Sequence, residues 1–374
     1  MKFSLNTVVW GEPYVRSLLD RSLPTLFSEG NLLDENWRST FVYQLMTTEK
    51  DFETIQRAKI FERLKSTIEV EVLYIDDIHV DESETTYKYN KVSIAQTRGM
   101  KHAMECDCDG MFFLYPDFVY ATGSLSIIAK SLSEGHCAVM CPIPFIASEA
   151  VKDGVITALG CEVSTEQGRE VSLAPRQLVE LSIRHPHPVN VGFDVDSGVY
   201  GEWPGVFIWS VPGQGQLIRS FHLHPIGLLL RKDDPSFLIH FEVSLDDEFV
   251  SRVYKTDDNF MFIDDSDNLA ICSMRGVEEP PHTMNGYRGN IRRAAIWAEE
   301  YTGTILRYFT SVSFFWHYED IDKDDWQQAQ FRSDEFMKML NYRLRVPATI
   351  LHIEDPESFE ARRRRMFHFS HANE

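Results

Sequence analysis

Short apolar runs alternate with amphipathic stretches along the first third of the chain. Residues 2–10, 41–46 and 70–75 are mostly apolar and predict buried strands. Between them, apolar side chains recur at helical spacing, and Pro13 fits the first turn of a helix. Strands that alternate with helices predict βαβ units, hence an α/β protein whose mainly parallel, Rossmann-type sheet is flanked by helices.

The same alternation continues through residues 91–125. An amphipathic helix is followed by an acidic break, a buried strand at 111–115, and the single carboxylate Asp117. An acid just beyond an apolar strand lies where open α/β sheets bind their ligands. Asp117 is therefore either a ligand-binding residue or a cap for the following turn.

Later segments are less regular. Residues 137–145 predict a further strand, which Pro142 and Pro144 would place near a sheet edge. The stretches 288–315 and 334–344 predict helices. Because Pro280 and Pro281 interrupt the chain before them, we expect a domain over residues 1–280 and a helical extension over 281–374.

Composition narrows the function classes. The 374 residues carry a formal net charge of −20, which disfavours non-specific binding to nucleic acid. Four consecutive arginines, Arg362 to Arg365, are the exception. They form either a solvated helix face or a contact with an acidic partner or an anionic membrane surface.

The cysteines and the hydropathy indicate the compartment. Six scattered cysteines, without a clean zinc spacing, predict reduced and mostly buried thiols. The N-terminal sequence does not resemble a signal peptide, and no apolar run approaches the ~20 residues that a membrane-spanning helix needs. We therefore expect a cytoplasmic protein.

The residues around Asp117 carry a spaced motif: Arg98-Gly99-x3-Ala103, then Asp109-Gly110-x3-Leu114-x2-Asp117. This motif resembles the central segment of GT-A-fold glycosyltransferases, especially the inverting family-2 type. The resemblance covers about the first 130 residues and extends loosely to Asp267. It implies transfer of a sugar from a nucleotide-diphosphate donor to a glycan or other hydroxyl acceptor.

The resemblance also implies a divalent cation, Mn2+ or Mg2+, bound by a D-x-D motif that neutralises the departing diphosphate. Here that motif is Tyr115-Pro116-Asp117, so only its last acid is present. His222 and His224 resemble the histidine that such enzymes use as a late metal ligand. Their spacing would place both side chains on one face of a strand.

The resemblance further implies a donor site at the ends of the first strands, formed by Val9, Trp10, Gly11, Glu12, Thr47, Asp76 and Arg98. Each residue also has a structural alternative. The alternatives are a core position for Trp10, a turn for Gly11, a cap of the helix that follows for Thr47 and Asp76, and an ion pair with a nearby acid such as Glu105 for Arg98.

An inverting transfer needs a carboxylate that accepts the acceptor's proton. Asp247 is the first candidate and Asp246 the second; the alternative is an acidic helix start. A later acidic cluster, residues 264–267, lacks the EF-hand spacing and predicts a β-turn.

Two functions remain open. The chain is either a glycosyltransferase or a GT-A-like protein that only binds or assembles, which the incomplete D-x-D favours. A nucleotidyltransferase is disfavoured, because Gly11-Glu12-Pro13 is not the glycine-rich basic loop of that class.

Overall fold

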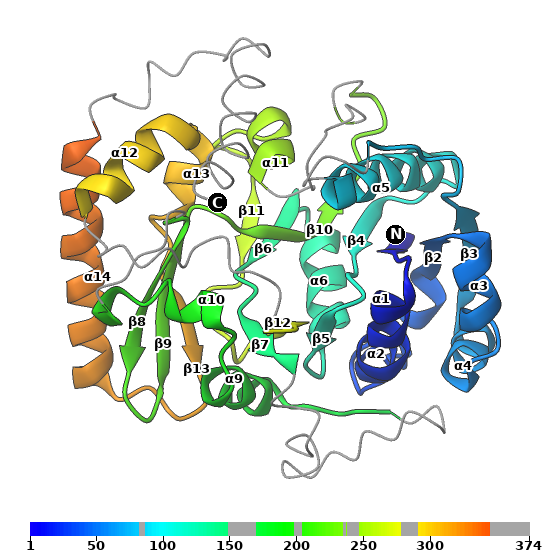
Figure 1. The fold of residues 1–374 in the computed structure, drawn as a ribbon, viewed down its shortest axis with the longest axis horizontal. Coiled ribbons are helices and arrows are strands. Elements are labelled where there is room, and N and C mark those ends of the chain that lie inside the picture. The colour runs from blue at the N-terminus through cyan, green and yellow to red at the C-terminus, as the bar shows by residue number, and fades with distance from the viewer. Residues whose placement is uncertain are drawn as a thin grey trace.

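A large twisted sheet with helices on both faces forms the body of the protein (Figure 1). The computed structural model describes residues 1–81, 87–148, 170–197, 204–234, 237, 247–277 and 291–344. Within these residues, helices and strands alternate as expected, and the α/β class is confirmed. The expected boundary at Pro280 and Pro281 and the arginines Arg362 to Arg365 lie outside the described residues.

The large sheet has seven strands in the order β11-β6-β10-β4-β1-β2-β3. Their bounds are β1 Phe3–Val8, β2 Phe41–Thr47, β3 Glu69–Tyr74, β4 Gly110–Phe113, β6 Ala138–Cys141, β10 His224–Leu229 and β11 Phe260–Phe262. Strand β1 pairs in parallel with both β2 and β4, and β2 pairs in parallel with β3. Only β10 runs against its neighbours, so the sheet is mainly parallel, as predicted.

The strand order reverses at β1. The chain moves outward from β1 to β2 and β3, then returns through a long helix to β4 on the other side of β1. Such a reversal is a topological switch point, and open α/β sheets bind ligands beyond the carboxyl ends of the strands there. The ends of β1 and β4 therefore define the place to examine for a site.

Helices cover both faces of this sheet. On one face lie α1 Glu12–Ser17, the π-helical turn η1 Leu18–Ser22, α2 Leu23–Leu26, α3 Glu49–Ile55, α4 Lys59–Thr67 and α6 Ser124–Ser133. Their apolar side chains share a core with Phe3, Leu5 and Phe112. The other face holds α5, Tyr87–Glu105, whose Ala95 packs with Val8 and Met46.

Two small sheets complete the strands. One has the order β5-β12-β7, with β5 Phe118–Tyr120, β12 Ile271–Arg275 and β7 Phe145–Ala147; the other has the order β13-β9-β8, with β13 Phe314–His317, β9 Gly215–Ser220 and β8 Val206–Val211. The first small sheet begins directly after β4. It therefore lies close to the carboxyl end of that strand.

One strand prediction needs correction. Residues 137–145 form two strands in different sheets rather than one. Strand β6 lies next to the edge strand β11 of the large sheet, in agreement with the predicted place near an edge, and β7 is an end strand of a small sheet. Pro142 and Pro144 fall in the break between β6 and β7. Because proline cannot donate to a strand ladder, the chain leaves the sheet where the prolines begin.

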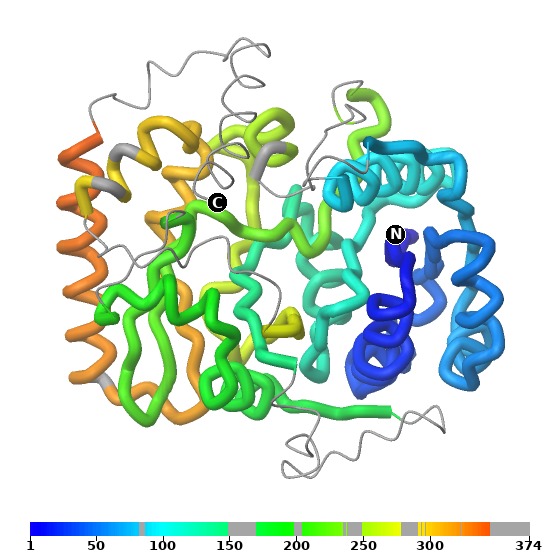
Figure 2. The backbone as a smooth tube through the Cα atoms, viewed as in Figure 1, coloured from blue at the N-terminus to red at the C-terminus, as the bar shows by residue number. Residues whose placement is uncertain are grey.

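The C-terminal part is helical, as expected, with α12 Ile291–Tyr301, α13 Thr304–Phe309 and α14 Lys323–Arg343. It lies on the side of the molecule opposite α3 and α4 (Figure 2). The predicted helix over 288–315 is interrupted between Tyr301 and Thr304 and ends at Phe309. Phe314–His317 instead forms β13 beside β9. Shorter helices are α9 Pro175–Arg184, α10 Pro188–Val191 and α11 Asp247–Val253.

Helix α5 crosses the sheet unusually closely, and Gly99 allows it. A Cβ atom at this position would lie 2.6 Å from both Asn6 Nδ2 and Gln44 Oε1. Below it, Asn6 Nδ2 donates to Gln44 Oε1 at 2.6 Å and Gln44 Nε2 donates to the Gly99 carbonyl at 3.2 Å. The glycine therefore serves close packing.

We predict that Gly99→Ala destabilises the protein by about 1–3 kcal/mol, the usual range for overpacking a core. The loss should appear although alanine favours an open helix position by about 1 kcal/mol over glycine. Urea unfolding measures it. Lys101→Ala, at an exposed position of the same helix, is the control and should stay within about 0.5 kcal/mol of the parent. Equal stability of the two variants would contradict the close packing.

Candidate functional site

The residues after β1 lie at the switch point and are tied to the next helix. Val9 is buried, and its amide donates to the Met46 carbonyl at 2.9 Å. Gly11 has φ +81°, a conformation that favours glycine, and its amide donates to Asp51 Oδ2 at 2.9 Å. This turn directs the chain into α1, where Glu12 pairs with Arg16 at the surface.

Trp10 is half-buried rather than part of the core. The Lys91 Nζ of α5 lies 5.5 Å from the centroid of its ring. A second contact of the same kind joins Lys88 of α5 to Tyr14 of α1, at 5.7 Å. The first turns of α5 therefore lie over the segment that follows β1, and they bring two positive charges to this edge of the sheet.

The predicted residues after β2 and β3 have structural partners. Asp76 Oδ2 accepts from the Glu49 amide at 2.9 Å, so it binds the start of α3, which precedes it in the chain, rather than the start of the helix that follows it, as the alternative expected. Arg98 donates to both carboxylate oxygens of Asp77, at 2.8 and 3.0 Å, and its hydrogen bond lowers the pKa of that acid. The ion-pair alternative for Arg98 thus applies, with Asp77 in place of Glu105.

Several buried oxygen atoms on the elements that surround the switch point lack a hydrogen-bond partner among the described residues. They are Asn6 Oδ1, Ser17 Oγ, Thr47 Oγ1, Ser93 Oγ and Gln96 Oε1. They come from β1, α1, the end of β2, and the half of α5 that reaches the switch point. Buried polar atoms are nearly always paired, so such a group marks a place where a polar ligand would supply partners.

Gln96 ties this group to β4. Its Nε2 donates to the Tyr115 hydroxyl at 3.2 Å, and the Tyr115 carbonyl in turn accepts from Ser22 Oγ at 3.4 Å. Tyr115 follows β4 directly. The end of β4 is therefore joined to α5 on one side and to η1 on the other.

Asp117 faces the first small sheet. Its Oδ2 accepts from Ser273 Oγ at 2.5 Å and lies 3.7 Å from Arg275 Nε. The Asp117 carbonyl also accepts from the Met274 amide at 2.8 Å. Both side-chain partners come from β12, so the carboxylate that remains of the D-x-D motif already has a neutralising positive charge beside it.

The two histidines have different surroundings. His224 is the first residue of β10, and its ring lies 6.4 Å from Tyr115 and 6.3 Å from Phe118. These residues enclose the segment that carries Asp117. His222 precedes the strand, and its ring lies 5.5 Å from that of Trp297. Because His222 lies outside β10, the two histidines are not on one face of a single strand, as their spacing predicted.

The predicted catalytic acids lie farther along the chain. Asp246 lies outside the described residues. Asp247 is the first residue of α11, which agrees with the alternative of an acidic helix start. Their role in proton transfer stays a prediction.

A group of side chains that the sequence did not suggest is able to hold a metal ion: Asp265, Asp267 and His317. The His317 Nε2 lies 3.0 Å from Asp265 Oδ1 and 3.9 Å from Asp267 Oδ2, while Nδ1 lies 2.8 Å from the Glu319 carbonyl. Both ring nitrogens face acceptors. The ring is thus either doubly protonated or, with Nδ1 donating to the carbonyl, placed to bind a cation through Nε2.

This group lies beyond the carboxyl end of β11, which runs in the same direction as β4. The expected β-turn is present, since the Asn268 amide donates to the Asp265 carbonyl at 3.1 Å. The Asp-x-Asp spacing was visible in the sequence. Its connection with His317, fifty residues later, was not, because it depends on where β13 lies.

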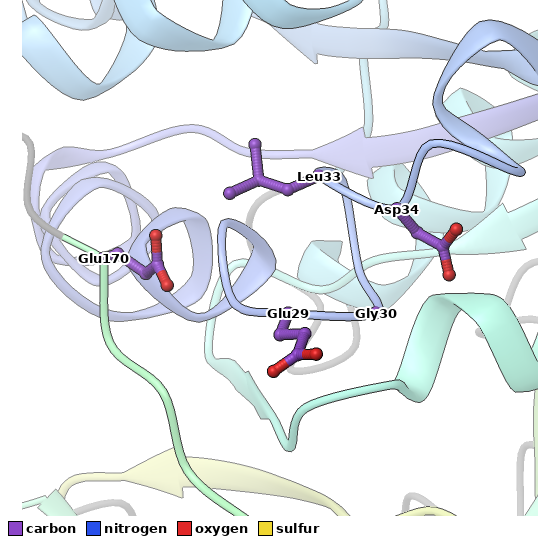
Figure 3. A pocket seen from close by; sticks show the side chains of 5 residues that line it. All are labelled: Glu29, Gly30, Leu33, Asp34 and Glu170. Atoms are coloured by element: carbon purple, nitrogen blue, oxygen red, sulfur yellow. The ribbon is translucent and has the colours of Figure 1, made fainter.

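One cavity, of about 420 Å³, is lined by Glu29, Gly30, Leu33, Asp34 and Glu170 (Figure 3). Two of its acids have partners: Asp34 accepts from Ser126 Oγ at 2.5 Å, and Glu170 pairs with Arg63 at 3.3 Å. None of the predicted site residues lines it. Three carboxylates would repel a diphosphate, so this cavity is not a candidate donor site.

Comparisons with known proteins add little. No protein-family model matches the chain, and no curated protein matches it. The crystal structure of S. aureus TarS is similar over 39% of this chain and 22% of that chain, with 13% sequence identity and a TM-score of 0.26. A TM-score this low does not establish a shared fold. Among the described residues, no helix is long and apolar enough to cross a membrane.

The ion pair between Arg176 and Asp267 predicts an effect of pH on stability. Arg176 donates to both carboxylate oxygens at 2.9 and 2.8 Å and thereby lowers the pKa of Asp267 below its ordinary 3.8. A lowered pKa contributes stability above the unfolded value and loses it as the pH falls through the folded value. The pair is partly exposed, so this contribution should stay below about 1 kcal/mol.

Asp267→Asn should therefore be slightly less stable than the parent at pH 7 and approach its stability as the pH falls below 4. Urea unfolding over a pH series measures the difference. Asp257→Asn, which changes an exposed acid, is the control and should show no such convergence. A difference that grows toward low pH would contradict the prediction.

Proposed function

We propose that this chain is a GT-A-like glycosyltransferase that moves a sugar from a nucleotide-diphosphate donor to a glycan or other hydroxyl acceptor. The observation that supports it best is the set of buried, unpaired oxygens on β1, at the end of β2 and on α5, where Gln96 also contacts Tyr115 after β4. These strands form the switch point of the sheet. Base and ribose hydroxyls, rich in donors and acceptors, would supply the missing partners.

The donor would extend from β1 toward β4. Trp10 offers an aromatic surface for the base, and Thr47 offers a buried hydroxyl at the end of β2. Lys91, near the ring of Trp10, would contribute positive charge toward the phosphates. On a chain with net charge −20, such local cations are needed to attract a diphosphate.

The diphosphate would lie near Asp117, beside Arg275, and His224 contacts Tyr115 and Phe118 on either side of that acid in the sequence. A divalent cation, Mn2+ or Mg2+, would neutralise the leaving group there. Asp117 and either His224 or His222 would hold it, and Asp117 would then exchange its contact with Arg275. The released guanidinium would remain close enough to bind a phosphate oxygen.

Asp265, Asp267 and His317 provide a second place for the cation. Two carboxylates and an imidazole are a suitable ligand set for Mn2+. Asp247, or Asp246, would accept the proton of the acceptor hydroxyl as the diphosphate leaves from the opposite face. These roles belong to the proposal.

We predict that Asp117→Asn abolishes Mn2+-dependent hydrolysis of the nucleotide-sugar donor. The amide keeps a hydrogen bond to Ser273 but removes the negative charge that a metal needs. Asp265→Asn distinguishes the two candidate metal sites. If the ion binds at Asp117, Asp117→Asn should lose the Mn2+-dependent hydrolysis and Asp265→Asn should keep it. Asp257→Asn is the matched control. Turnover unaffected by Asp117→Asn would remove that acid from the site.

Binding can be tested separately from turnover. A nucleotide that binds only the folded chain raises the melting temperature, and at 100 times Kd it adds about 2.7 kcal/mol of stability. UDP or GDP with Mn2+ should therefore raise the Tm of the parent. Ser93→Val with Gln96→Leu, which replace two of the unpaired oxygens, should reduce the shift. If no nucleotide raises the Tm, the donor site is refuted.

The second candidate function is a non-catalytic binding or assembly protein. It is favoured by the ion pair of Asp117 with Arg275, because that pair neutralises the only acid left of the D-x-D motif. In this case a nucleotide would raise the Tm without Mn2+, and no donor hydrolysis would follow.

A further inference from the structure

A second cluster of ligand atoms lies away from the switch point, between α5 and the edge strand β3. It consists of Glu71 on β3, His102 on α5, and Cys106, the residue directly after α5, whose amide donates to the His102 carbonyl at 2.9 Å. The His102 Nε2 lies 3.0 Å from Glu71 Oε2 and 3.5 Å from Cys106 Sγ. The sulfur lies 3.8 Å from Glu71 Oε1.

This arrangement differs from a nucleophilic triad. In such a triad one imidazole nitrogen meets the thiol and the other meets the acid. Here the thiol and the carboxylate both approach the same atom, Nε2. Burial and the charge of Glu71 also raise the pKa of the Cys106 thiol, which disfavours a free nucleophilic thiolate.

Convergence on one point is instead the geometry of a metal centre. Zinc bonds of about 2.0–2.3 Å in a tetrahedron place N, O and S ligand atoms about 3.4–3.6 Å apart. The three separations observed, 3.0, 3.5 and 3.8 Å, lie within about 0.4 Å of that range. Side-chain rotations alone would therefore suffice to close the site around an ion.

We propose that Glu71, His102 and Cys106 bind a zinc ion, with water as the fourth ligand. A thiolate with an imidazole selects zinc over Mg2+ or Ca2+, which prefer oxygen ligands. The side chains of Glu71 and His102 are 27% and 29% exposed, so the ion would be reached from solvent. The bound ion would fasten the end of α5 to the last strand of the sheet.

Binding exchanges one proton for the ion. The Cys106 thiol loses its proton to solvent as sulfur bonds to zinc, and the neutral imidazole binds through the Nε2 lone pair. Without the ion, the Glu71 carboxylate faces His102 and Cys106; with the ion bound, it would be the oxygen ligand. The charge nearest the site on the other side is Lys2, whose Nζ donates to the Cys106 carbonyl at 3.4 Å.

The test uses the full-length reduced chain, freed of metal with EDTA and titrated with Zn2+ and with Co2+. The parent should bind one Zn2+ in a manner that depends on Cys106 and show the thiolate-to-cobalt charge-transfer band. Cys106→Ser should abolish that band, and His102→Gln should weaken zinc binding at least about 100-fold, beyond what removal of an outer partner costs. Zinc should also protect Cys106 from alkylation.

Two controls keep the result specific. Cys137→Ser changes another half-buried thiol, the residue just before β6, and should leave the band intact. Asp265→Asn alters the other metal-capable group and should also leave it intact. Melting temperatures in EDTA show that each variant is folded. A parent that gives no cobalt–thiolate band, or a Cys106→Ser variant that retains one, would overturn the proposal; neither result bears on nucleotide binding.

Discussion

The close contact between α5 and the first two strands is the constraint on which both candidate sites depend. Gly99 lets the helix approach the Asn6–Gln44 pair, and Gln44 donates to the helix backbone in return. This crossing returns the chain to the far side of β1 and so creates the switch point. It also fixes the two ends of α5. Gln96 then meets Tyr115 at the end of β4, whereas His102 meets Glu71 on β3.

Charge pairing explains how so acidic a chain arranges its functional edge. Asp117 lies beside Arg275, and Asp267 binds Arg176. Each pair keeps a carboxylate available while limiting repulsion among neighbouring acids. A cation that displaced the arginine would gain a ligand and free a guanidinium for a phosphate. The pairs are therefore compatible with metal binding at a cost in affinity.

The sequence predicted most of the sheet that creates the switch point, because the relevant information is local. Strands β1 to β4 and helices α5 and α6 follow apolar runs and helical spacing, which any short window shows. The errors arose where contacts with residues far away in the sequence determine the secondary structure. Residues Phe314–His317 have a helical neighbourhood but pair with β9, and the single strand predicted over residues 137–145 is divided between two sheets.

The same reasoning explains the site residues. Positions after strand ends were predictable, since chain order already places them at one edge of a parallel sheet. The side-chain partners could not be predicted from the sequence. Arg98 binds Asp77, and Asp117 contacts Ser273 and Arg275 on a strand more than 150 residues later.

The pair of Asp117 and Arg275 is also where catalysis and simple binding diverge. A transferase must stabilise charge that develops on the leaving diphosphate, whereas a binding protein needs only to match its ground state. A guanidinium fixed on Asp117 offers its charge equally to both states. In the proposed transferase, a guanidinium released by a metal ion at Asp117 would be free to contact the leaving oxygen, and the metal would add its own positive charge there. In the proposed function, the availability of this carboxylate, more than the presence of the fold, would therefore determine whether the switch point carries out chemistry.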